Sequence, residues 1–206
     1  MMAVREGWHW LQESRELRFP PFTRVEWGQT LKARGKLEIC KNGMHASERA
    51  IDALWFAPGP IICRVKLYGP FAPQKGHKDK WCGRSRTVLW MADATMVLWE
   101  WACWCAERAL MAERVAGREP HRDSWTAIVA RRAWIRGEIT DDDLGAAHSA
   151  ADSAAHSAAH SAAHRAAYSA AYSAAHSAAY SAEEDAQNVE LERLLWTLAP
   201  KEYPDE

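Results

Sequence analysis

The residues best suited to chemistry lie in one short segment, Cys40-Lys41-Asn42-Gly43-Met44-His45-Ala46-Ser47. A thiol and an imidazole this close in the chain can act as a nucleophile and its base. A His beside the free N–H groups of a helix start can instead hold an anion or a phosphate. No third residue that would orient such a pair is obvious. A buried structural Cys and a His that caps the turn therefore remain the simpler alternative.

Basic residues further along the chain could complete an anion site. Lys80, Arg84 and Arg86 lie close together in the sequence, and guanidinium and ammonium groups are the usual phosphate contacts in proteins. The alternative is that these residues form the solvated edge of a strand.

Strands and a helix must position these residues. Alternating or β-branched residues predict strands over 36–40, 61–68 and 85–91, and residues 8–32 contain one or two shorter strands. Ser47 is predicted to cap a helix over 48–57, which Pro58 ends.

Helices dominate the second half of the sequence. Residues 93–115 are apolar nearly all round, which predicts a buried helix, and a shorter helix is expected from Asp123 or Ser124 to Gly137. Residues 189–198 are amphipathic and are expected to dock on the core or to pair with a second copy. Strands followed by helices indicate an α+β fold, with a small mixed or antiparallel sheet and buried helices.

A four-residue unit, Ala-x-Ser-Ala, repeats from Ala146 to Ala182 with one break, at Arg165. Its alanines predict a long helix, with Thr140 and Asp143 forming a capping box at its start. We therefore expect an α+β head domain over 1–139, a repeat helix over 140–182 and a C-terminal amphipathic helix and tail over 183–206.

The variable position of the repeat places His156, His160 and His164 one helical turn apart, with Asp152 a turn before them. Such a row can chelate a transition metal. Tyr replaces His later in the repeat without other change, so a solvated polar stripe is the simpler interpretation, and no metal site or other cofactor is predicted. A face for a partner or for a second copy of the chain is the third alternative.

Composition narrows the function classes. The chain has 206 residues and a net charge of -1, which argues against non-specific nucleic-acid binding. No long apolar run predicts a membrane span, and the N-terminus does not resemble a signal peptide. Five cysteines without Cys-x-x-Cys spacing favour a reducing, cytoplasmic setting. Most of the twelve tryptophans precede residue 135, where they predict a Trp-rich core or the lining of a ligand pocket.

The pattern Cys40-x-x-Gly43-x-His45-Ala46-Ser47, with the segments 52–59 and 63–69 after it, resembles a domain of unknown function found in phage and prophage proteins. The resemblance covers roughly residues 8–110 and extends to Ala-rich repeats downstream. It implies a bacterial host cytoplasm and no established activity.

His9, the Gly-x-His-Ala-Ser turn and the Gly-ended strand are also similar to ADP-ribosyltransferase-like folds, which grip NAD with an early His or Arg and a following Ser, Thr or Tyr. Those enzymes need a late Glu on a strand, whereas Glu100 and Glu107 fall in a predicted helix.

The first expectation is therefore a binding or interaction protein whose partner is a host or phage protein. The alternative is a nucleotide-binding or nucleotide-handling protein. No catalytic residue is assigned. The candidate ligand-binding residues are His9, Cys40, Gly43, His45, Ser47, Lys80, Arg84 and Arg86.

Overall fold

The computed structural model describes residues 3–72, 79–163 and 173–203, and for 154–163 and 173–181 it describes the backbone alone. The chain divides into two compact units. The sheet unit comprises residues 1–95 and 188–206, and the helical unit comprises residues 96–187. The predicted boundaries, at 139/140 and 182/183, follow composition, whereas the units follow tertiary contacts and join both ends of the chain.

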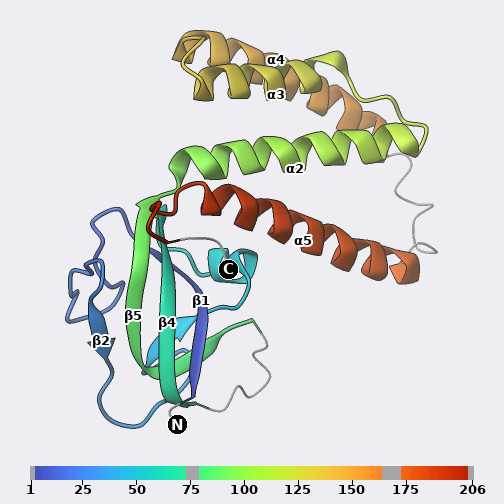
Figure 1. Cartoon of the computed structure of the whole chain (residues 1–206). Helices are drawn as coiled ribbons and strands as arrows, with labels where there is room; N and C mark the ends of the chain where they lie inside the picture. Colours follow the sequence, from blue (N-terminus) through green and yellow to red (C-terminus); the bar gives the residue numbers. More distant parts are fainter. Residues whose placement is uncertain (1–2, 73–78, 164–172, 204–206) are drawn as a thin grey trace. The chain divides into compact units, whose positions relative to one another are not determined.

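An antiparallel sheet forms the sheet unit, which is one of the two forms, mixed or antiparallel, that the sequence leaves open (Figure 1). Its strands are β1 (Val4–Leu11), β4 (Ile61–Phe71), β5 (Trp81–Asp93) and β2 (Thr30–Lys32), in that order, and β3 (Met44–Ala46) also pairs with β5. Alternate residues of β4 face a core made of the side chains Leu11, Val25, Ala46, Ile61, Cys63, Val65, Leu67 and Val88.

The register places polar residues on this same core face. His9 lies opposite Cys63, and Arg86 lies opposite Leu67. Directly opposed residues of neighbouring strands share a face of the sheet. His9 and Arg86 therefore project to the side where the core and the loop 12–47 lie.

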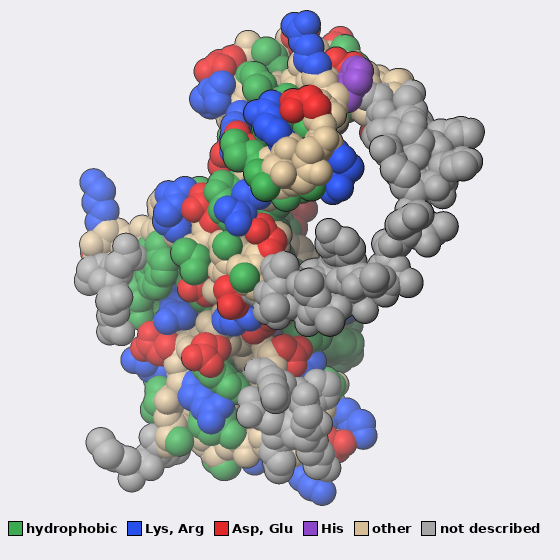
Figure 2. Space-filling view, turned by 90° about the vertical axis from the view of Figure 1, so that its right-hand side faces the viewer, with side chains coloured by type: hydrophobic (Ala, Val, Ile, Leu, Met, Phe, Trp, Pro, Cys, Tyr) green, Lys and Arg blue, Asp and Glu red, His purple; other side chains and the backbone are tan. Residues whose placement is uncertain are grey.

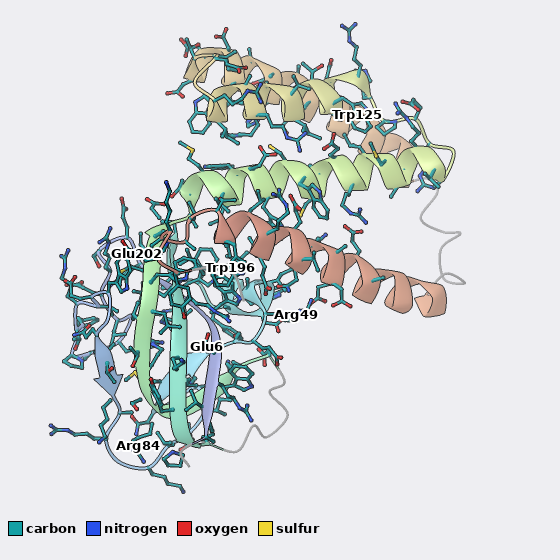
Figure 3. The ribbon with its side chains drawn as sticks, viewed as in Figure 1. Glu6, Arg49, Arg84, Trp125, Trp196 and Glu202 are labelled. Carbon is teal, nitrogen blue, oxygen red and sulfur yellow. The ribbon has the colours of Figure 1, made fainter. Side chains whose placement is uncertain are left out.

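The other face carries a tryptophan cluster. Trp8 and Trp90 are buried and meet Trp196 at ring-centroid distances of 5.5 and 5.7 Å. Trp196 is the last residue of α5 (Ser173–Trp196), and Leu191 and Leu195 of the same helix are fully buried. Figure 3 shows Trp196 beside the strands. The expected docking of the C-terminal amphipathic segment on the core is therefore confirmed.

The segment between β2 and α1 differs from the prediction. Residues 36–40 form no strand; they make a tight loop in which Glu38 and Asn42 exchange backbone hydrogen bonds. A bend at 35–36 and a turn at 39–41 leave no room for an extended strand, so the alternating pattern was misleading.

The helix after it is also shorter than predicted. α1 spans only Ala50–Leu54, and Ser47 does not cap it, because Ser47 pairs with Trp8 through backbone bonds of 2.8 and 3.0 Å. The first N–H groups of α1 instead donate to Glu192 and Asn188 of α5. A tertiary contact supplies the cap that local sequence reasoning assigned to Ser47.

The helical unit contains α2 (Thr95–Val115) from its second residue, α3 (Arg122–Ile135), α4 (Asp141–Ala163) and the first part of α5. The predicted capping box is confirmed, since Thr140 and Asp143 exchange hydrogen bonds at the start of α4. The prediction of buried helices is wrong for α2, whose one buried residue is Cys103. Large apolar residues such as Trp99 and Met111 stay exposed.

The repeat is helical up to Ala163 and again from Ser173, and residues 164–172 lie outside the described chain. A single helix across residues 140–182 is therefore not confirmed. The side chains of His156, His160 and His164 also lie outside the described part. Among the helices that the structure describes, none combines the length and apolar character needed to cross a membrane.

Candidate functional site

A pocket of about 630 Å³ opens on the core side of the sheet unit. Its walls come from β1, from the segments 17–21 and 32–47, and from residues 53–58 at the end of α1 and after it, with Lys80 contributing from just before β5. Pockets for small ligands in proteins typically measure about 300–1,000 Å³. The volume therefore suits one small organic ligand.

The charged side chains that line the pocket are all positive. Five cationic residues line the pocket, and no Asp or Glu from the described chain does. The cations are Arg18, Lys32, Arg34, Lys41 and Lys80. Such a lining attracts anions, because every charged wall residue adds to a positive potential.

Aromatic side chains lie next to some of these cations. The ammonium of Lys80 lies 3.8 Å from the centroid of Phe56, and the guanidinium of Arg18 lies 5.6 Å from that of Phe19. Both aromatic residues line the pocket. Flat apolar rings beside cations can bind a ligand that has both a ring and a negative charge.

The imidazole of His45 forms hydrogen bonds with the backbone of the preceding turn. Its Nε2 accepts a hydrogen bond from the backbone N–H of Cys40 at 3.2 Å, and the ring also bonds to the backbone of Gly43. Burial, together with the charges of Arg86 and Lys80, lowers the pKa of His45 to about 4. The ring is therefore neutral at pH 7 and closes the turn, as the simpler alternative from the sequence expected.

Arg84 and Arg86 lie outside the pocket lining and hold the wall from behind. Arg84 donates to the carbonyl oxygens of Ala33 and Gly35, at 3.0 and 2.8 Å. Arg86 donates to the carbonyl oxygen of His45 at 2.8 Å. Figure 3 labels Arg84 near the β2 edge of the sheet. These contacts fix loop 33–45, so both arginines position the wall.

Arg86 is an unusual buried charge. It is 2% exposed, and its Nε has no hydrogen-bond partner in the described chain. Burial lowers the pKa of Arg86 to about 10, so it still carries its proton at neutral pH. Its charge also affects His9, whose pKa lies well below the usual value because of burial, Arg86 and His45.

Six of the eight candidate residues meet in this pocket. His9, Cys40, Gly43, His45, Ser47 and Lys80 line it. The sequence analysis missed other lining residues, namely Arg18, Phe19, Lys32, Arg34 and Phe56. These come from loops and a strand end whose course depends on tertiary bonds, and no local pattern marks them.

The alternative chemistries find less support. Cys40 is exposed and offers His45 its backbone N–H. Glu100 and Glu107 lie on α2, where both pair with Arg132, so neither supplies the late Glu on a strand that an ADP-ribosyltransferase needs. No group of His, Cys, Asp and Glu in the described chain is arranged to hold a metal.

Comparison with known proteins finds no matching family model, no matching curated protein and no matching solved structure. The pocket geometry is therefore the basis for a functional proposal.

Proposed function

We propose that the sheet unit binds a small anionic ligand that contains a ring, with a nucleotide as the best-fitting class. The observation that carries this proposal is the composition of the pocket lining. It contains five cationic residues, the two exposed phenylalanines Phe19 and Phe56, and no acidic residue from the described chain. Phosphate oxygens suit Arg and Lys, and a base suits the faces of Phe19 and Phe56.

Loop 32–47 supports this proposal because it is held in place before any ligand arrives. The Asn42 amide donates to the carbonyl oxygens of Arg34 and Lys36, at 2.7 and 2.8 Å, and Arg84 fixes the same loop from β5. A wall that is already ordered loses little conformational entropy on binding. Lys32 and Arg34 are thereby presented to a ligand at fixed positions.

A thermal-shift screen tests the proposal. The panel comprises AMP, ATP, NAD and cyclic AMP, with adenosine and inorganic sulfate as probes for the ring alone and the anion alone. A ligand at one hundred times its Kd stabilises a protein by about 2.7 kcal/mol. We expect a nucleotide to shift Tm more than either partial probe. No shift with any nucleotide would contradict the proposal.

Paired variants link the shift to the pocket. Lys32→Ser combined with Arg34→Ser removes two lining cations, and we expect about tenfold weaker nucleotide binding. This corresponds to about 1.4 kcal/mol. Lys36→Ser is the matched control, because Lys36 is an exposed cation of the same loop that does not line the pocket. Equal losses in both variants would contradict a site at this pocket.

The resemblance to phage and prophage domains adds a setting to the proposal, a bacterial cytoplasm, where nucleotides are abundant. Within the proposal the repeat over 140–182 is a helical spacer that presents the sheet unit. Circular dichroism of a peptide with this sequence tests that part, since a helical spacer requires predominantly helical signal.

A further inference from the structure

His9 differs from the other polar residues of the pocket in having an uncommitted ring. It lines the pocket from β1 and is partly exposed. No hydrogen bond joins its imidazole to any residue that the structure describes. Both ring nitrogens of His45, in contrast, are engaged with its own turn. His9 is therefore the histidine able to bind a ligand.

A buried positive charge lies close to His9. Arg86 projects from β5 on the same face of the sheet, and its Nε lacks a partner in the described chain. No carboxylate pairs with this guanidinium among the described residues; its one hydrogen bond goes to the carbonyl of His45. A buried cation that no acidic residue of the described chain neutralises thus lies behind the pocket wall.

Burial and the positive charges near His9 favour the neutral form of its imidazole. Arg86 faces it from β5 and His45 from β3. Cys63 lies opposite it on β4, and burial raises the pKa of that thiol to about 12, so it brings no negative charge. An anionic ligand would be the first opposite charge next to His9, and opposite charges favour the protonated imidazole.

We infer that His9 binds the ligand's anionic group and takes up one proton as the ligand enters, so that ligand binding and protonation are coupled. This inference rests on the proposed function, because it requires an anion in the pocket. An imidazolium donates from both nitrogens, whereas the neutral ring donates from one. A phosphodiester or a pyrophosphate has oxygens that can accept these hydrogen bonds from His9.

Isothermal titration of the full chain with NAD tests the coupling, because the NAD pyrophosphate does not itself titrate between pH 5.5 and 7.5. Titrations at both pH values, each in two buffers of different ionisation enthalpy, give the affinity and the number of protons taken up. Uptake of one proton raises affinity by at most about tenfold for each pH unit lowered. We expect about fivefold or more tighter binding at pH 5.5, with proton uptake of up to one per NAD.

Two variants assign the proton. His9→Gln keeps one donor but cannot be protonated, and we expect weaker binding that no longer changes with pH. His148→Gln, on α4 in the helical unit, is the matched control and retains the pH dependence. If His9→Gln does not fold, an NMR titration of the histidine resonances of the unmodified protein tests the same point. We expect NAD to raise the pKa of His9, and an unchanged pKa would overturn the coupling.

The outcomes separate the two ideas. NAD binding with equal affinity at both pH values and no proton uptake overturns the coupling and leaves the pocket function intact. Proton uptake that persists in His9→Gln also overturns it. Absence of NAD binding at either pH contradicts the proposed function, and the coupling fails with it.

Discussion

The two units differ in how deeply some of their tryptophan and arginine side chains are buried. In the sheet unit, Trp90 is 0% exposed and Arg86 is 2% exposed. In the helical unit, Trp99 is 40% exposed and lies under the guanidinium of Arg131, 4.2 Å from its charge centre. Trp90 and Arg86 are thus part of the core of the sheet unit, whereas Trp99 and Arg131 contact each other at the surface of the helical unit.

The two units also differ in the size of their apolar cores. Of the described residues of the helical unit, only Cys103, Ile128 and Leu144 are buried and apolar. Figure 2 shows Lys and Arg side chains beside Asp and Glu over its helices, and the ion pairs of Arg108, Arg114 and Arg118 are solvent-exposed. Exposed pairs add little stability. The sheet unit can hold a pocket rigidly because a core supports it.

The largest difference in stability between the two units is expected when one tryptophan is replaced in each. Trp90→Ala removes a fully buried ring that packs on Trp8 and Trp196, and we expect a loss of about 3–5 kcal/mol in the free energy of unfolding. Trp99→Ala should cost about 1 kcal/mol or less. Urea unfolding of both variants measures this, and similar losses would show that the units are packed alike.

Acid should destabilise the sheet unit selectively. The pKa of His9 and of His45 lies below the ordinary value of 6.5 in the folded state. The unfolded chain therefore binds more protons below pH 6.5, and stability falls as pH falls. The loss should be at most about 2 kcal/mol per histidine between pH 6.5 and 5, where carboxylates remain ionised.

Hydrogen exchange of β4 and β5 amides at several pH values measures this loss. The double variant His9→Gln/His45→Gln is expected to show a shallower dependence on pH. The same dependence in protein and variant would mean that other groups titrate.

Asn188 tests whether the end of α5 belongs energetically to the sheet unit. Its side chain accepts from the buried N–H of Ile51 at 3.0 Å, and Asn188→Ala leaves that donor without its acceptor. We expect a loss of about 1–2 kcal/mol in unfolding free energy. Val189→Ala is the control on the exposed side of the same turn. Equal stability of the two variants in thermal unfolding would contradict the docking.

The smallest effect is expected for Arg108→Ala. Its guanidinium makes a bidentate ion pair with the Glu183 carboxylate inside the helical unit, but both side chains are exposed. We expect a loss of about 0.2–1 kcal/mol, decreasing with added salt. Urea unfolding at low and high salt measures it, and a loss above about 2 kcal/mol would show that such pairs replace a core.

Sequence patterns predicted the elements whose signals are local. β4 and β5 follow β-branched runs, and the start of α4 follows its capping box. The same reasoning failed at residues 36–40, where Glu38 and Asn42 close a tight loop. It also failed at Ser47, where backbone pairing with Trp8, distant in sequence, overrides the local preference.

The candidate site divides in the same way. Local spacing pointed to the Cys40–Ser47 segment, and six of the eight candidates line one pocket. It assigned Arg84 and Arg86 to the ligand, whereas both hold loop 33–45. Arg18, Lys32 and Arg34 carry no local signal and were missed.

The amino-acid sequence by itself determined the α+β character, the capped start of the repeat and the position of the Cys40–Ser47 segment, because side-chain periodicity and backbone capping act over a few residues. Only the tertiary structure decided which of these residues face a ligand. The direction of a side chain in a loop depends on hydrogen bonds from distant strands, as the bonds from Arg84 and Arg86 to residues 33–45 illustrate. Burial of charge is likewise a property of the packed chain, and it sets the protonation of His9 and His45.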